Sequence, residues 1–416
     1  MKAHYELLPP YLRRHDGRNL RRVYLRTEQQ LWRQRETNPL TRRQFLAALS
    51  AGAALAIPGR AGASQDAENF PDIHSVQPDL VVPPVSTLPP GPGRRVVRTL
   101  PGYEHTDVHH LLYLPVDWQP GKVYPMLVDY PGNGNYHSPY GDVSTGEVEG
   151  CNLGYGISGG QGFIWIAMPF VDPQHKSNQR MWWGDVDATL DYCKHAVVDV
   201  CEQFGGDNAS VILCGFSRGA IACNFIGLHN KEVADIWLAF IPFSHYDGVE
   251  KWDWAGSDRA SALDRLELLN GRASFISQEK SIDNIRDYLK STPVEAPFTF
   301  QTIPYRNHNS GWTLCDIPAR RALRAWLGET LAKRPGVYDL RGKVRDAHGG
   351  PVKRVRIQSG YTHWAFTDGS GDFLLRGLVA SQRIVMPIKE GADFRPPQLS
   401  VEVGKKAVKH LDFRLL

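Results

Sequence analysis

Five residues in the middle of the chain, Gly215-Phe216-Ser217-Arg218-Gly219, have the pattern G-x-S-x-G. An apolar run at 211–214 precedes them, and the small residues at 220–222 follow them. This context is typical of a sharp strand-to-helix turn, whose glycines let the strand and the helix approach each other closely. The serine at the tip of such a turn stands clear of the sheet. Ser217 is therefore the predicted nucleophile.

A serine hydroxyl is a weak nucleophile until a base accepts its proton, so a histidine is expected nearby. His308 follows the last predicted strand, at 298–303, and precedes the last helix of this part of the chain. His245 is the alternative, but it lies one strand earlier. We predict that His308 is the general base. His245 then lines the site or is a hydrogen-bonded loop residue.

A carboxylate is expected to orient the histidine and to stabilise its charged form. Two candidates, Glu279 and Asp283, follow the predicted strand at 273–277. We predict Asp283, because aspartate is the commoner residue in this role. Glu279 remains the alternative.

Backbone N–H groups are expected to hold the negative oxygen that forms during acyl transfer. The segment Pro131-Gly132-Asn133-Gly134-Asn135 follows a predicted strand, and its glycines allow an N–H near Asn133 to point at that oxygen. The N–H of Arg218 is the predicted second donor. The Arg218 side chain either binds an acidic group of the substrate or pairs with a structural carboxylate.

Two further segments are expected to shape the pocket. One is the glycine-rich run at 154–162, and the other is the segment at 179–184, which contains Trp182 and Trp183. These tryptophans either stack on a substrate or pack within the protein.

Alternating strands and helices are expected to position these groups. Strands are predicted at 109–114, 126–130, 163–168, 210–214, 236–241, 273–277 and 298–303, and helices at 185–204, from 220 onward and at 318–331. The turn-rich segment at 115–122 is predicted to join its two strands in a hairpin-like way. The alternation indicates a mostly parallel sheet with helices on both faces.

Two regions flank this predicted catalytic domain at 96–333. Residues 64–95 are rich in proline and are predicted to be a linker or an irregular arm. Beyond 334–336, short runs alternate with period two and are separated by turn residues, so residues 337–416 are predicted to form a small antiparallel β-sandwich.

The N-terminal segment, 1–63, resembles a twin-arginine export signal. Arg42-Arg43 precedes an apolar run at 45–57, and Ala61-Gly62-Ala63 provides small residues for cleavage. The run is too short for a bilayer span, which needs about 20 residues. The expected partners are the twin-arginine translocase and a signal peptidase, and the expected location is the periplasm or the exterior.

The charge of the chain is divided unevenly. Residues 1–63 hold 12 Lys and Arg against 4 acidic residues, which leaves 36 against 40 in the remainder. The remainder is mildly acidic, so no nucleic-acid partner is expected.

A resemblance to a known superfamily rests on three groups of residues. Tyr113-Leu114-Pro115 with Pro125–Val128, the motif at 215–219, and Asn307-His308-Asn309 resemble the α/β-hydrolases, in particular secreted esterases related to feruloyl esterases and polyhydroxybutyrate depolymerases. Pro131 stands where a histidine is usual in them. Residues 337–416 resemble the carboxypeptidase regulatory-like (transthyretin-like) domain, for example in Thr367–Phe373.

The prediction is an exported serine hydrolase of carboxylic esters, whose substrate is a small molecule or a polymer such as a polysaccharide. No cofactor is expected and no metal, because none of the six cysteines has metal-ligand spacing. Two alternatives are a serine peptidase of the same fold and a non-catalytic cell-surface binding protein. Substrate and oligomeric state stay open.

Overall fold

A computed structural model describes residues 70–404 and 410–416. The predicted export signal at 1–63 lies outside these residues, as does the beginning of the predicted linker. Within the described part of the chain, no helix is both long and apolar enough to cross a membrane.

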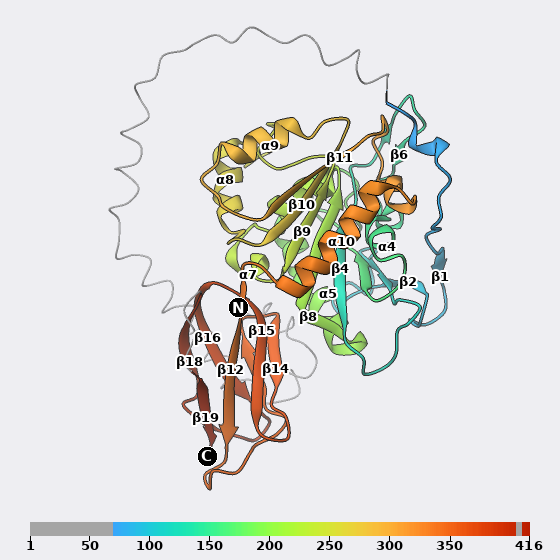
Figure 1. The fold of residues 1–416 in the computed structure, drawn as a ribbon. Helices are drawn as coiled ribbons and strands as arrows, with labels where there is room; N and C mark the ends of the chain where they lie inside the picture. Colours follow the sequence, from blue (N-terminus) through green and yellow to red (C-terminus); the bar gives the residue numbers. More distant parts are fainter. Residues whose placement is uncertain (1–69, 405–409) are drawn as a thin grey trace, which may run out of the picture. The chain divides into compact units, whose positions relative to one another are not determined.

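A nine-stranded sheet lies at the centre of the larger folded region (Figure 1). Its strands are β1 (Val85–Ser86), β2 (Arg95–Arg98), β3 (His110–Tyr113), β4 (Tyr124–Tyr130), β7 (Ile164–Ala167), β8 (Gly206–Phe216), β9 (Ala239–Phe243), β10 (Ala273–Glu279) and β11 (Phe298–Ile303). Their order across the sheet is β1-β2-β3-β7-β4-β8-β9-β10-β11. The six strands from β7 to β11 in this order run parallel, so their carboxyl ends share one edge.

Helices cover both faces of the sheet. They are α4 (Leu153–Ser158), α5 (Val186–Phe204), α6 (Arg218–Phe225), α7 (Lys231–Ala234), α8 (Arg259–Glu267), α9 (Asp283–Lys290) and α10 (Pro318–Lys333). Two apolar clusters result, because neighbouring strand residues point to opposite faces. Met126 of β4 joins Leu190 of α5 in one cluster, and Leu127 joins Leu323 of α10 in the other.

The segment between β3 and β4 differs from the prediction. β3 and β4 are not a hairpin, because β7 lies between them and pairs with both. Turn residues at 115–122 only mark where the chain reverses, and they do not specify which strands become neighbours. Helices α8 and α9 were not predicted either.

The proline-rich stretch is an arm packed along the domain over its described residues, 70–95. Ile73, in the short helix η2 (Ile73–Ser75), is 4% exposed. Asp79 accepts a 2.7 Å hydrogen bond from Arg320, and β1 extends the sheet beside β2. Its many prolines limit regular structure to short elements, but they do not prevent this packing.

Residues from Val337 onward form two four-stranded sheets. Their strands are β12 (Val337–Arg345), β13 (Arg356–Ser359), β14 (His363–Phe366), β15 (Asp372–Val379), β16 (Ser381–Ile388), β17 (Phe394–Arg395), β18 (Leu399–Val403) and β19 (Leu411–Leu415). The orders are β15-β12-β19-β17 and β14-β13-β16-β18. Val344, Ile357, Leu375 and other buried residues fill the core between them. The predicted fold class, an α/β-hydrolase sheet followed by a small all-β sandwich, is confirmed.

Candidate active site

Ser217 occupies a strained turn between β8 and α6. Its φ is 55° and its ψ is −113°, a combination that non-glycine residues rarely adopt. The flanking glycines are required by close packing. A Cβ on Gly215 would lie 2.2 Å from the carbonyl oxygen of Gly219, and one on Gly219 would lie 2.0 Å from that of Tyr130. The turn therefore holds the serine at the carboxyl edge of the sheet.

His308 reaches Ser217 from the loop after β11. Its Nε2 lies 3.1 Å from Ser217 Oγ, and its Nδ1 lies 2.5 Å from Glu279 Oε1. Because a carboxylate accepts hydrogen bonds, Nδ1 carries a proton toward Glu279, which leaves Nε2 free to accept the serine proton. The structure thus brings together a serine, a histidine and a carboxylate from the ends of three strands.

The prediction that Asp283 is the acidic partner is wrong. Asp283 begins helix α9, its side chain is 68% exposed, and it pairs with Arg286 at 2.6 Å. Strand β10 continues two residues past its predicted end, so Glu279 stands at the strand terminus beside His308 and is only 9% exposed. The alternative, Glu279, is the residue in contact.

Ser244 is a fourth member of this group that was not predicted from the sequence. Its hydroxyl donates to Glu279 Oε1 at 2.8 Å and lies 2.8 Å from His308 Nδ1. It immediately follows β9 with a φ of 85° and is 1% exposed. Its place at the carboxyl end of a parallel strand is the signal that could have revealed it, because such ends meet at one edge.

A cavity of about 230 Å³ lies in front of Ser217 and His308. It is lined by Asn133, Tyr136, Ser144, Trp182, Ser217, Arg218, Ile221, His245, Trp252 and His308. Asn133 and Arg218, the predicted oxyanion residues, both line it. Arg218 is the first residue of α6, where N–H groups have no partner within the helix and favour negative charge.

The Arg218 side chain fits neither predicted role. It is 1% exposed and donates to the carbonyl oxygens of Trp182 (2.7 Å), Gln179 (3.2 Å) and Gly146 (3.2 Å). Its guanidinium also lies 4.1 Å from the ring centre of Phe170. Burial lowers the pKa of Arg218 to about 9. Arg218 thus ties together two of the loops around the cavity.

His245 lines the cavity but does not contact Ser217 through any hydrogen bond of the structure. Its ring centre lies 5.5 Å from that of His308, and its Nδ1 is buried without a hydrogen-bond partner among the described residues. Burial, and then the charge of His308, lower the pKa of His245 to about 4. It is a neutral polar group in the wall of the cavity.

The two tryptophans at 182 and 183 differ in their surroundings. Trp182 lines the cavity, and its ring centre lies 5.2 Å from that of Trp252. Trp183 is 5% exposed and packs on Phe225. The glycine-rich run at 154–162 does not line this cavity. It forms α4 and its end, where Gly154 lets the helix pack against Trp165.

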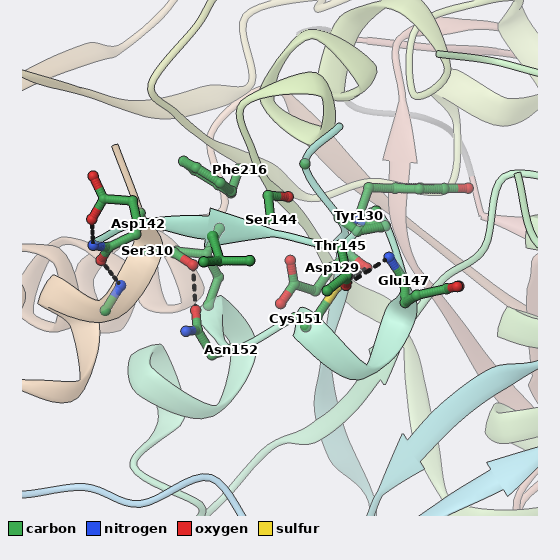
Figure 2. Close-up of a pocket in the computed structure, with 18 of the residues that line it drawn as sticks. Asp129, Tyr130, Asp142, Ser144, Thr145, Glu147, Cys151, Asn152, Phe216 and Ser310 are labelled. Carbon is green, nitrogen blue, oxygen red and sulfur yellow. Dashed lines mark hydrogen bonds between the residues drawn. The ribbon is translucent and has the colours of Figure 1, made fainter. Parts of the chain in front are cut away.

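A second cavity, of about 220 Å³, is lined by Phe216 and by Ser144, which also lines the first cavity (Figure 2). Asp142 and Ser310 lie at one end of it and Glu147 at the other, with Asp129 between them. Burial raises the pKa of Asp129 to about 7, although it accepts a 3.1 Å hydrogen bond from the Gly154 N–H. The described residues contain no cluster of three or more His, Cys, Asp or Glu that could hold a metal.

Comparisons with known proteins show similarity at the level of solved structures. No protein-family model matches the chain, and no curated protein matches it. It is similar to a thermostable esterase at 13% identity (TM-score 0.37), over 56% of this chain and 62% of that one. It is similar to the feruloyl esterase module from Clostridium thermocellum at 14% identity (TM-score 0.39), over 61% of this chain and 94% of that one. It is also similar to the acetyl ester-xyloside bifunctional hydrolase from Caldicellulosiruptor lactoaceticus at 14% identity (TM-score 0.39), over 59% of this chain and 98% of that one.

The chain therefore spans less than two thirds of the thermostable esterase. Because these TM-scores are below 0.5, the similarities carry no argument about activity.

Proposed function

We propose that this protein is a serine hydrolase that cleaves carboxylic esters. The observation that carries the proposal is the chain of contacts from Ser217 Oγ to His308 Nε2 (3.1 Å) and from His308 Nδ1 to Glu279 Oε1 (2.5 Å). This geometry supplies a nucleophile, a base in contact with it and a carboxylate that orients the base.

The reaction would proceed in two halves. Ser217 Oγ bonds to the ester carbonyl carbon as its proton passes to His308 Nε2, and the carbonyl oxygen becomes negative. N–H groups near Asn133 and at Arg218 would hold that oxygen. The carbon–oxygen bond then breaks, and His308 gives its proton to the leaving alcohol. Water, activated by the same histidine, releases the acid and restores Ser217.

The cavity wall supports a substrate with an apolar group beside the reacting ester. Trp182, Trp252 and Ile221 form this part of the wall, and they can cover a flat or aliphatic group. The wall also has polar residues outside the reaction chain, namely His245, Ser144 and Tyr136.

The test compares the full-length protein with Ser217→Ala on p-nitrophenyl butyrate and on a matched p-nitroanilide. We expect wild-type turnover of the ester, a loss of at least about 10³-fold in kcat/KM in the variant, and slower cleavage of the amide. Faster cleavage of the amide would indicate a peptidase instead. A folded wild type that hydrolyses neither would contradict the proposal and favour a binding protein.

We further propose that the protein is exported. The support is Arg42-Arg43 followed by the apolar run at 45–57. Cell fractionation of the wild type and of a variant with both arginines changed to lysine tests this. Export of the wild type alone is expected, and equal cytoplasmic retention of both would contradict it.

A further inference from the structure

A short β-hairpin packs against the loop that carries His308. The hairpin consists of β5 (Tyr136–His137) and β6 (Val143–Ser144), with the connection at 138–142. Tyr136 places its ring centre 4.9 Å from that of His308, in an edge-on arrangement. The guanidinium of Arg306 lies 4.6 Å from the ring centre of Tyr140.

Asp142 is the centre of these contacts. Its Oδ2 accepts the backbone N–H of His308 at 2.9 Å, and its Oδ1 accepts the side-chain amides of Asn307 at 3.0 Å and of Asn309 at 2.5 Å. Ser138, in the same hairpin, donates to Oδ2 at 2.8 Å. One carboxylate thus contacts three consecutive residues of the catalytic loop.

The environment of Asp142 suits an ionised anchor. Asp142 is 2% exposed, so its carboxylate has lost nearly all contact with water. Burial alone would raise the pKa of Asp142, but the hydrogen bonds from Asn307, Ser138, His308 and Asn309 outweigh it, and the pKa lies below its usual value. A buried carboxylate with four donors is costly to disturb, because each donor would then lose its partner.

The connection at 138–142 is itself closed by hydrogen bonds. Ser138 Oγ accepts the N–H of Asp142 at 3.1 Å, and the Ser138 N–H donates to the Asp142 carbonyl at 3.0 Å. On the other side, Asn307 Oδ1 accepts the N–H of Ile73 at 2.7 Å. His308 is therefore fixed between two packed segments and not by its own short loop alone.

We propose that Asp142 is a positioning residue of the catalytic site, which sets the place of the His308 ring by binding the backbone and the neighbours of that residue. Asp142 touches neither Ser217 nor Glu279 through any hydrogen bond of the structure, so its effect passes through His308. The inference rests on the proposed function, because it assigns the effect to the base of that reaction.

The main test measures kcat and KM of Asp142→Asn in the full-length protein. Asparagine has the same size as aspartate, but its NH₂ group would face groups that donate hydrogen bonds to Asp142, so the loop that carries His308 must shift. A shift of about 1 Å costs on the order of 100-fold in rate, so kcat should fall about 10- to 100-fold with KM changed less than about threefold. The matched control is Asp172→Asn. Asp172 is 8% exposed and accepts the N–H groups of Lys176 and Ser177 in a different loop, and its change should leave kcat within about twofold.

A second readout does not depend on turnover. A proton in the 2.5 Å contact between His308 Nδ1 and Glu279 should give a strongly downfield ¹H NMR signal, lost in Glu279→Gln. We expect this signal to shift or broaden in Asp142→Asn and to stay unchanged in Asp172→Asn. If Asp142→Asn does not fold, Asn309→Asp replaces it, because it keeps the oxygen that accepts the Gly311 N–H but sets a second carboxylate against Asp142.

The outcomes separate the two claims. If the wild type hydrolyses esters while Asp142→Asn, or Asn309→Asp used in its place, keeps the wild-type kcat and NMR signal, the positioning role of Asp142 is refuted and the proposed function stands. If the wild type has no activity but the NMR signal still responds to Asp142→Asn, the function fails while the positioning of His308 holds.

Discussion

Glu279 Oε1 lies 2.5 Å from Nδ1 of His308 although 29 residues separate them in the chain. The contact exists because β10 and β11 run parallel with Glu279 opposite Ile303, the last residue before the loop that carries His308. The carboxylate therefore fixes the ring orientation that lets Nε2 face Ser217.

The first prediction concerns this carboxylate. Glu279→Gln preserves its shape but favours the wrong histidine tautomer, so kcat should fall by about 10²- to 10⁴-fold. Asp283→Asn is the matched control, because Asp283 is exposed and paired with Arg286, and it should keep activity within about twofold. Steady-state kinetics of both variants on the same ester shows which of the two carboxylates supports His308. A larger loss in Asp283→Asn would restore the aspartate as the partner.

The second prediction separates the two histidines of the cavity. His308→Ala should lower kcat/KM by at least about 10³-fold, because the base is lost. His245→Ala should lower it by less than about 30-fold, mainly through KM, because its buried ring meets substrate only as a neutral polar wall. Comparable losses of kcat in both variants would give His245 a role in the proton transfer itself.

Several of these features could be predicted from the sequence because their signals are local. Strand β11 has the predicted bounds, Phe298–Ile303, and helix α5 begins one residue after its predicted start because Asp185 caps it. The turn at Ser217 is specified by glycines two residues away on either side. The fold class followed from this alternation of strands and helices.

The parts that were missed depend on contacts between distant segments. Asp142 and His308 are 166 residues apart, and no local sequence pattern indicates that the aspartate binds the backbone of His308. Asp283 was preferred to Glu279 because aspartate is commoner in this role, but a two-residue extension of β10 decides which acid reaches His308. The Arg218 side chain was expected to bind a charge, but the carbonyl groups it binds come from loops whose paths only the fold defines.

The third prediction concerns Asp129, which is buried near the second cavity. Its pKa is 3.8 in a model peptide and about 7 in the folded protein, so the folded state retains a proton that the unfolded chain releases. Stability should therefore fall as the pH rises from 3.8 to about 7. Near pH 3.8, Asp129→Asn should be as stable as the wild type. Above about pH 7 it should be more stable than the wild type, by up to about 4 kcal/mol.

Thermal melts across this pH range measure the effect. Asp117→Asn is the control of opposite sign, because the Gly162 N–H lowers the pKa of Asp117 and its charge contributes stability that is lost as the pH falls. If Asp129→Asn is less stable than the wild type at pH 8, the assignment of a protonated Asp129 is contradicted.

The central claim is that His308 activates Ser217, and labelling with a fluorophosphonate tests it most directly. Wild type, Ser217→Ala and His308→Ala would be treated with the reagent and digested, and the modified peptide would be located by mass spectrometry. We predict one phosphonyl group, on Ser217 of the wild type, no label in Ser217→Ala and strongly slowed labelling in His308→Ala. A folded wild type that is not labelled, or a label on another residue that persists in Ser217→Ala, would contradict it.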